Sequence, residues 1–153
     1  MSNRDRVHLA RALRVASTST ERIKHGAVVV KSGRVISVGV NTFRNHPNTV
    51  SDPEHESSYH AEINAIVDAE SKGINVEGAT IYVTLEPCSH YGKTPPCALK
   101  IVDKKFKRVV VGSNDPNPLV SGGALELIGN AGVADVPAVL EAECTEMIKV
   151  LFT

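Results

Sequence analysis

The stretch that decides the fold of this chain reads TIYVTLEPCSHYGKTPPCALKIVD, residues 80–103. Its first six residues are rich in β-branched and aromatic side chains, which predicts a strand over residues 80–85. The turn that follows is rich in Pro and Cys, and residues 98–103 then return to helical spacing. A strand, a turn and a helix in this order form the repeating unit of an α/β domain.

The segments on either side continue this alternation of strands and helices. Upstream, the expected elements are a helix over 5–17, a hairpin of strands 27–31 and 34–40 turning at Ser32-Gly33, a long polar loop over 41–58, and a helix from His60 to Gly73. Downstream, they are a strand over 108–111, a loop over 114–123, a short helix ending near Asn130, a strand over 133–136 and a closing helix over 138–151. The sequence therefore predicts a single three-layer α/β domain over residues 1–153, with a central mixed β-sheet flanked by helices.

Charge and composition exclude several classes of protein. The 17 basic residues equal the 17 acidic ones, and aromatic residues make up 4%, so we expect no nucleic-acid partner. No apolar run reaches the roughly 20 residues that cross a bilayer, and the first ten residues lack the apolar core of a signal peptide. Three cysteines are not the even set of a disulfide framework. We therefore expect a cytoplasmic protein with no membrane partner.

Three short motifs supply the donors of a metal site: His60 with Glu62, Cys88 after Pro87, and Cys97. One imidazole and two thiolates suit zinc and leave its fourth tetrahedral position for water. A structural zinc site would use four protein ligands. The remaining cysteine lies in a Glu-rich segment of the predicted closing helix and offers no convincing fourth ligand. We predict one catalytic Zn²⁺ bound by His60, Cys88 and Cys97.

Glu62 follows His60 by two residues, on the same first turn of the predicted helix. A carboxylate there can take the proton of a zinc-activated water, whose pKa falls to about 7. Taken singly, each of these residues would indicate an ordinary core or surface position. Together, H-x-E followed by Pro-Cys and a second Cys is the signature of zinc deaminases. The predicted reaction is hydrolytic deamination, with Glu62 as the catalytic residue.

The run over residues 84–97 resembles the deaminase domain of the bifunctional riboflavin-biosynthesis deaminase/reductase. Eight residues separate Cys88 from Cys97, whereas two separate the cysteines of most cytidine-deaminase-like proteins. The later runs DPNPLVSG (115–122) and AGV (131–133) resemble the same family. Since the chain ends at Thr153, we expect no reductase activity from it.

The resemblance implies a substrate and its contacts. The substrate would be the diamino-ribosylamino-pyrimidinone 5′-phosphate of riboflavin synthesis, and the protein would form a homo-oligomer. Four residues match family positions that hold the ribosyl phosphate: His90, Lys93, Asp115 and Asn117. An ammonium group on a Gly-flanked loop suits a phosphate, although Lys93 as a solvated loop lysine stays an alternative. His90 as a zinc ligand is a further alternative, although a residue only two positions after Cys88 is expected to point away from the metal.

Two upstream runs, HGAV (25–28) and GVN (39–41), resemble instead the deoxycytidylate deaminases, in which the Asn faces the sugar. Asn41 is therefore a further candidate substrate-binding residue. A deaminase of another pyrimidine nucleotide, such as the cytosine nucleotide dCMP, stays open. A nucleic-acid base as substrate would call for a positively charged groove. A non-enzymatic zinc module would call for a fourth protein ligand or a missing Glu62.

Overall fold

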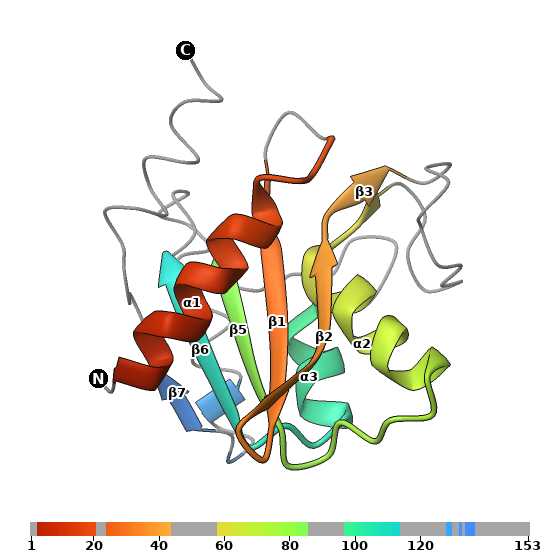
Figure 1. Ribbon diagram of the computed structural model, residues 1–153. Helices are drawn as coiled ribbons and strands as arrows, with labels where there is room; N and C mark the ends of the chain where they lie inside the picture. Colours follow the sequence, from red (N-terminus) through yellow and green to blue (C-terminus); the bar gives the residue numbers. More distant parts are fainter. Residues whose placement is uncertain are drawn as a thin grey trace.

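The main sheet has five strands in the order β2-β1-β5-β6-β7 (Figure 1). The computed structural model describes residues 3–20, 24–43, 58–85, 97–113, 128–129, 132 and 134–136. The strands are β1 (Gly26–Lys31), β2 (Arg34–Val40), β5 (Thr80–Leu85), β6 (Arg108–Ser113) and β7 (Ala134–Val136). β1 pairs antiparallel with β2 and β5, whereas β5, β6 and β7 are parallel. The predicted mixed sheet is confirmed.

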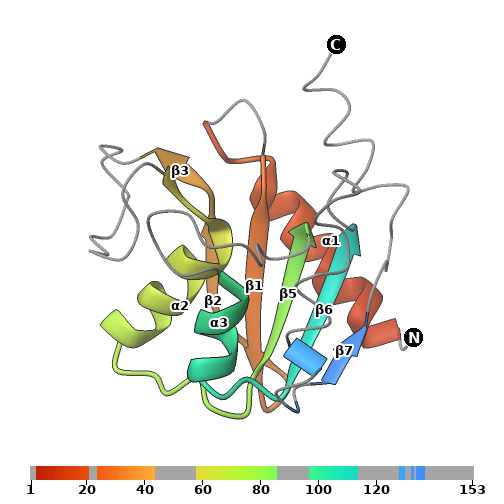
Figure 2. The same cartoon turned by 180° about the vertical axis from the view of Figure 1, so that it is seen from behind.

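Helices cover both faces of this sheet, which confirms the predicted three layers (Figures 1 and 2). α1 (Asn3–Ala16) lies on one face, and α2 (Ala61–Ser71) and α3 (Cys97–Asp103) lie on the other. Because successive side chains of a strand point to opposite faces, the sheet contributes residues to two hydrophobic cores, one on each face. Val28 and Tyr82 pack with Leu9 under α1, whereas Val29 and Ile81 belong to the core under α2 and α3.

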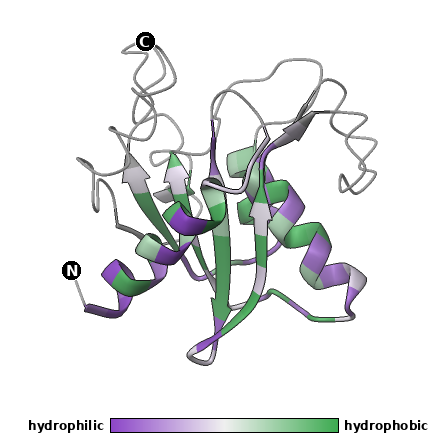
Figure 3. Cartoon of the chain, turned by 45° about the horizontal axis from the view of Figure 1, so that its top comes forward, coloured by the Kyte–Doolittle hydropathy of each residue, from purple (hydrophilic) through white to green (hydrophobic). Residues whose placement is uncertain are grey.

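Hydrophobic residues concentrate along the central strands, while the helices alternate between hydrophobic and hydrophilic positions (Figure 3). This pattern is expected of helices that bury one face against a sheet. Within the described part of the chain, no helix combines the length and apolarity that crossing a membrane demands.

Several boundaries differ from those expected. α1 begins at Asn3 and α3 begins at Cys97 itself. The segment expected as loop over 41–58 carries short strands at its two ends, because β3 (Thr42–Phe43) pairs antiparallel with β4 (Ser58–Tyr59). A strand of two residues is too short to show the alternation of apolar and polar residues from which a strand is predicted. Ile128 and Gly129 are helical, as the predicted short helix requires, whereas the predicted loop 114–123 and closing helix 138–151 lie outside the described residues.

Two glycines let helices approach the sheet closely. A Cβ added at Gly39 of β2 would lie 2.4 Å from the backbone O of Ala61 and 2.4 Å from the backbone N of Ala65, both in α2. A Cβ at Gly26 of β1 would lie 2.3 Å from the backbone O of Ala12 in α1. Only glycine permits such contacts. Gly39 is the one of the two that lies against α2, the helix that begins beside His60.

Candidate metal centre

His60 stands at the junction of β4 and α2. It is the N-cap residue of α2, with extended backbone angles (φ −74°, ψ 154°), and its carbonyl oxygen accepts the N–H of Asn64 at 3.1 Å. Its side chain makes no capping hydrogen bond to the helix. Instead the ring Nδ1 lies 3.0 Å from the Sγ of Cys97. The backbone of His60 therefore starts the helix while its imidazole faces α3.

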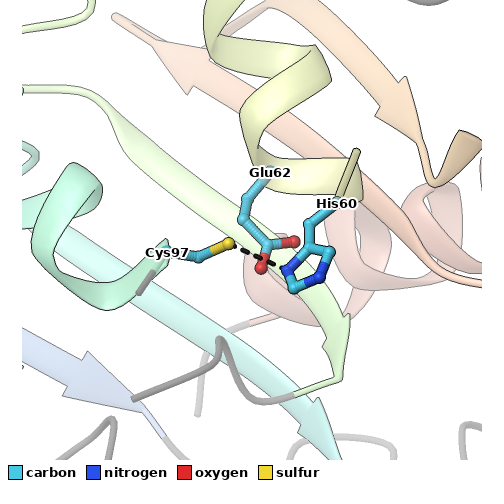
Figure 4. Close-up of side chains that lie close together, drawn as sticks. All are labelled: His60, Glu62 and Cys97. Atoms are coloured by element: carbon cyan, nitrogen blue, oxygen red, sulfur yellow. Dashed lines mark hydrogen bonds between the residues drawn. The ribbon is translucent and has the colours of Figure 1, made fainter. Parts of the chain in front are cut away.

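Three side chains from two helices converge at this point (Figure 4). Cys97 is the first residue of α3 and is fully buried, and Glu62, in the first turn of α2, is 7% exposed. The candidate donor atoms of His60, Glu62 and Cys97 all lie within 4.8 Å of one another. These three predicted site residues, 37 positions apart at their extremes, are thus brought together by the fold.

The donor set fits zinc. A tetrahedral zinc with Zn–S near 2.3 Å and Zn–N near 2.0 Å separates its nitrogen and sulfur ligands by about 3.5 Å. The 3.0 Å between His60 Nδ1 and Cys97 Sγ would therefore need to open by only about half an ångström. A soft thiolate beside an imidazole is the ligand pair that zinc selects in proteins. The third predicted ligand, Cys88, lies outside the described residues.

Asn64 ties the start of α2 to the end of β2. Its side-chain amide donates to the backbone O of Val40 at 2.7 Å and to Oγ1 of Thr42 at 3.1 Å, and the residue is 9% exposed. A buried amide that bridges two elements fixes their relative position. Sequence reasoning missed Asn64, although a polar residue between Ile63 and Ala65 in an otherwise apolar run was a usable signal.

Asn41 directly follows β2, where the sequence predicted a substrate contact. Its Oδ1 accepts the backbone N–H of His25 at 2.9 Å, and its own N–H donates to the backbone O of His25 at 3.3 Å. Its backbone O accepts the hydroxyl of Ser19 at 3.0 Å. Asn41 thus joins β2 to the residue that precedes β1. The other predicted substrate contacts, His90, Lys93, Asp115 and Asn117, lie outside the described residues.

Known proteins are similar to this chain in sequence and in fold. Residues 2–113 match the family described as cytidine and deoxycytidylate deaminase zinc-binding region. The riboflavin biosynthesis protein RibD of Aquifex aeolicus is 42% identical over 128 residues, which cover 84% of this chain and 32% of that protein. The chain spans about a third of the length of this curated relative.

Solved structures of deaminases have a similar fold. A diaminohydroxyphosphoribosylaminopyrimidine deaminase/5-amino-6-(5-phosphoribosylamino)uracil reductase from Thermotoga maritima is 37% identical, with a TM-score of 0.79 over 98% of this chain and 40% of that one. The dCMP deaminase of cyanophage S-TIM5 has a TM-score of 0.68 over 90% of this chain and 99% of that one. At 23% identity, the phage enzyme shows the fold alone.

These matches confirm the resemblance to the riboflavin-type deaminase domain and the zinc cofactor, while the individual ligands stay a prediction. The cluster of His60, Glu62 and Cys97 is consistent with a zinc site of this family. The chain belongs to the family of zinc-dependent cytidine and deoxycytidylate deaminases.

Proposed function

We propose that this chain is a hydrolytic deaminase of an aminopyrimidine nucleotide, namely the diaminohydroxyphosphoribosylaminopyrimidine of riboflavin biosynthesis. The observation that carries the proposal is the convergence of His60, Glu62 and Cys97 at the first turns of α2 and α3. A carboxylate beside an imidazole and a thiolate supplies both a metal site and a general base in one place.

Three residues would hold the metal in this proposal: His60, Cys97 and Cys88. When bound, zinc acts as a Lewis acid that makes water a nucleophile at neutral pH. Glu62 is then available for proton transfer, because the two helix starts already provide an imidazole and a thiolate as ligands. Its 7% exposure keeps the carboxylate away from bulk water, which favours directed proton transfer.

Glu62 would move two protons in the reaction. It takes one from the attacking water as the water oxygen bonds to the ring carbon that bears the amine, and it passes this proton to the adjacent ring nitrogen. It then takes the second proton from the hydroxyl group now bonded to that carbon and transfers it to the amine, so that ammonia leaves as the C–N bond breaks and the C=O bond forms. Water and the aminopyrimidine thereby give the keto-pyrimidine and ammonia.

The riboflavin-type substrate is supported by the relatives and by the insertion between the two cysteines. The Thermotoga maritima protein carries this deaminase activity in its name and is 37% identical. The insertion contributes His90 and Lys93, and the DPNP run contributes Asp115 and Asn117, as candidate contacts to the ribosyl phosphate. A cytoplasmic location, a homo-oligomeric assembly and a single domain over residues 1–153 belong to the same proposal.

A second candidate is a cytosine nucleotide such as dCMP. The observation that favours it is the pair of hydrogen bonds between Asn41 and the backbone of His25, in the two runs that resemble deoxycytidylate deaminases. These bonds hold Asn41 in a fixed place at the end of β2. A sugar hydroxyl bound there would be recognised by a pre-positioned amide.

A substrate panel separates the two candidates. Zinc-loaded protein is incubated with the diaminopyrimidine nucleotide, its dephosphorylated nucleoside and dCMP, and ammonia release gives kcat/KM for each. We expect the diaminopyrimidine nucleotide to be preferred. Preference for dCMP would overturn the riboflavin-type substrate and favour the second candidate.

The phosphate contact is tested on the same panel. Lys93→Ala should lower kcat/KM for the phosphorylated substrate by about 10- to 100-fold, because it removes a charged contact, and should barely affect the nucleoside. Lys105→Ala, at an exposed turn, is the matched control and should change neither value. Equal losses on both substrates would mean that Lys93 supports the loop and does not contact phosphate.

A further inference from the structure

A cavity of about 710 Å³ lies on the α1 face of the sheet. It is lined by the start of α1, the turn between β1 and β2, and the first residues of β5 and β6. The metal centre is built from α2 and α3, which cover the opposite face (Figures 1 and 2). The five-stranded sheet therefore separates the two sites, and a molecule in this cavity cannot reach His60 or Cys97.

The inner wall of this cavity is polar and buried. Asp5 is 3% exposed, Thr80 is 6% exposed, Tyr82 is 3% exposed and His8 is 9% exposed. Tyr82 donates its hydroxyl to Asp5 Oδ1 at 2.9 Å, and Arg108 donates to Asp5 Oδ1 at 3.2 Å and to Oδ2 at 2.9 Å. Packing of a hydrophobic core does not by itself explain why four buried polar side chains line the same cavity. They resemble the convergent polar groups of a ligand pocket.

The charge around the cavity is positive. Arg4, Lys107 and Arg108 line it, and Asp5 is the only acidic residue among the described residues that do so. The Asp5 carboxylate pairs with Arg108 through two hydrogen bonds, which leaves the positive charges of Arg4 and Lys107 in excess along the described lining. The whole chain, by contrast, has a formal net charge of zero. Desolvation by burial lowers the pKa of His8, and the charge of Arg11 adds to this effect, which favours the neutral imidazole.

We infer that this cavity is a second binding site, for a small phosphate monoester, separate from the metal centre. Its volume lies within the roughly 300–1,000 Å³ of small-molecule sites. Guanidinium and ammonium groups bind phosphate through charge-assisted hydrogen bonds, and the Asp5 pair holds the Arg108 guanidinium in place for this role. The hydroxyls of Ser32 and Thr80 add neutral donors on the same lining.

This site does not depend on the proposed reaction, so it can be tested without turnover. Uniformly ¹⁵N-labelled, zinc-loaded protein is titrated with ribose 5-phosphate and, separately, with inorganic phosphate, and amide shifts are followed by NMR. Saturable shifts at Gly33, Gly78 and Lys107 are expected with both probes. Shifts confined to Ala61, Glu62 and their neighbours would place the phosphate at the metal centre and overturn the inference.

Charge-matched variants test whether the lining residues bind the probe. Arg4→Gln/Lys107→Gln should weaken ribose 5-phosphate binding by about tenfold or more, because each cation supplies a charged contact. Arg14→Gln/Lys105→Gln removes the same charge from exposed positions outside the lining and should change affinity less than about twofold. Equal weakening in both variants would show diffuse attraction by surface charge and overturn the site.

A third variant tests the buried wall with no change of charge. Thr80→Val keeps the shape of the side chain and removes its hydroxyl. It should weaken binding by about threefold or more, because a neutral hydrogen bond to the ligand is lost. Wild-type affinity in Thr80→Val, together with wild-type affinity in Arg4→Gln/Lys107→Gln, would exclude the cavity as the binding site. Urea unfolding of each variant verifies that the fold is intact.

Discussion

The Nδ1 atom of His60 lies 3.0 Å from the Sγ atom of Cys97, at the point where the first turns of two helices meet. The extended backbone of His60 turns its ring away from its own helix, and Cys97 is fully buried as the first residue of α3. The fold thus brings together two residues that lie far apart in the sequence and that we predict to be two of the zinc ligands.

The first prediction concerns metal content. Cys97→Ala should reduce bound zinc from one per chain to nearly none, because the site loses one of its two predicted thiolate ligands. Cys144→Ala, at the remaining cysteine, is the matched control and should keep its zinc. Elemental analysis after purification without chelator gives the answer. A full equivalent of zinc in Cys97→Ala would remove that residue from the ligand set.

The second prediction separates catalysis from metal binding. Glu62→Gln keeps the size of the side chain but cannot accept the water's proton, so kcat should fall by at least about 10²-fold while zinc stays bound. Glu70→Gln changes the same charge on the same helix, at an exposed residue that pairs with Lys104, and should leave kcat nearly unchanged. Near-normal turnover in Glu62→Gln would show that another group transfers the proton.

The third prediction concerns the packing of α2 on β2. Gly39→Ala places a Cβ 2.4 Å from the backbone of Ala61, so α2 must shift and the free energy of unfolding should fall by about 2 kcal/mol or more. Gly26→Ala is the control, because it forces a similar contact under α1.

Both glycine variants should lower the urea midpoint, but only Gly39→Ala should also weaken zinc binding, since α2 carries Glu62 and begins at His60. Zinc competition with a chromophoric chelator measures this effect. Equal zinc affinity in the two variants would show that the close approach at Gly39 does not position the metal centre.

The fourth prediction concerns alkaline pH. Burial and the hydrogen bond to Asp5 raise the pKa of Tyr82 from 10.0 to about 12. The folded state therefore keeps a proton that the unfolded state releases, so stability should be fully present below pH 10 and should fall as the pH rises from 10 toward 12.

Tyr82→Phe removes this group and should flatten the fall in stability over that pH range. At neutral pH the same variant should cost about 1 kcal/mol, because Asp5 loses one donor. Urea unfolding at several pH values provides the comparison. An equally steep fall in both proteins would assign the alkaline sensitivity to other groups.

Local patterns in the sequence were sufficient to predict the strands of the main sheet and the order of its layers. β5 runs over the predicted residues, since its β-branched run is bounded by turn residues on both sides. The zinc cofactor was predictable from ligand types and their spacing, and the structure brings His60, Glu62 and Cys97 together, while the individual ligands stay a prediction.

Contacts between distant residues were not predictable. Asp5 and Arg108 pair across 103 positions, and Asn64 reaches back to Val40. The pairing of β3 with β4 likewise depends on a contact that only the folded chain provides. No local periodicity encodes such pairs, so the buried network at Asp5 and the position of α2 on β2 emerged only from the structure.

Turnover in H₂¹⁸O with zinc-loaded protein tests the central claim most directly. Hydrolytic deamination transfers the oxygen of water to the ring carbon, so the keto-pyrimidine should carry ¹⁸O, one ammonia should form per product, and both should fall sharply in Glu62→Gln. A product without ¹⁸O, or equal ammonia release from protein stripped of zinc, would contradict zinc-dependent hydrolysis at His60, Glu62 and Cys97.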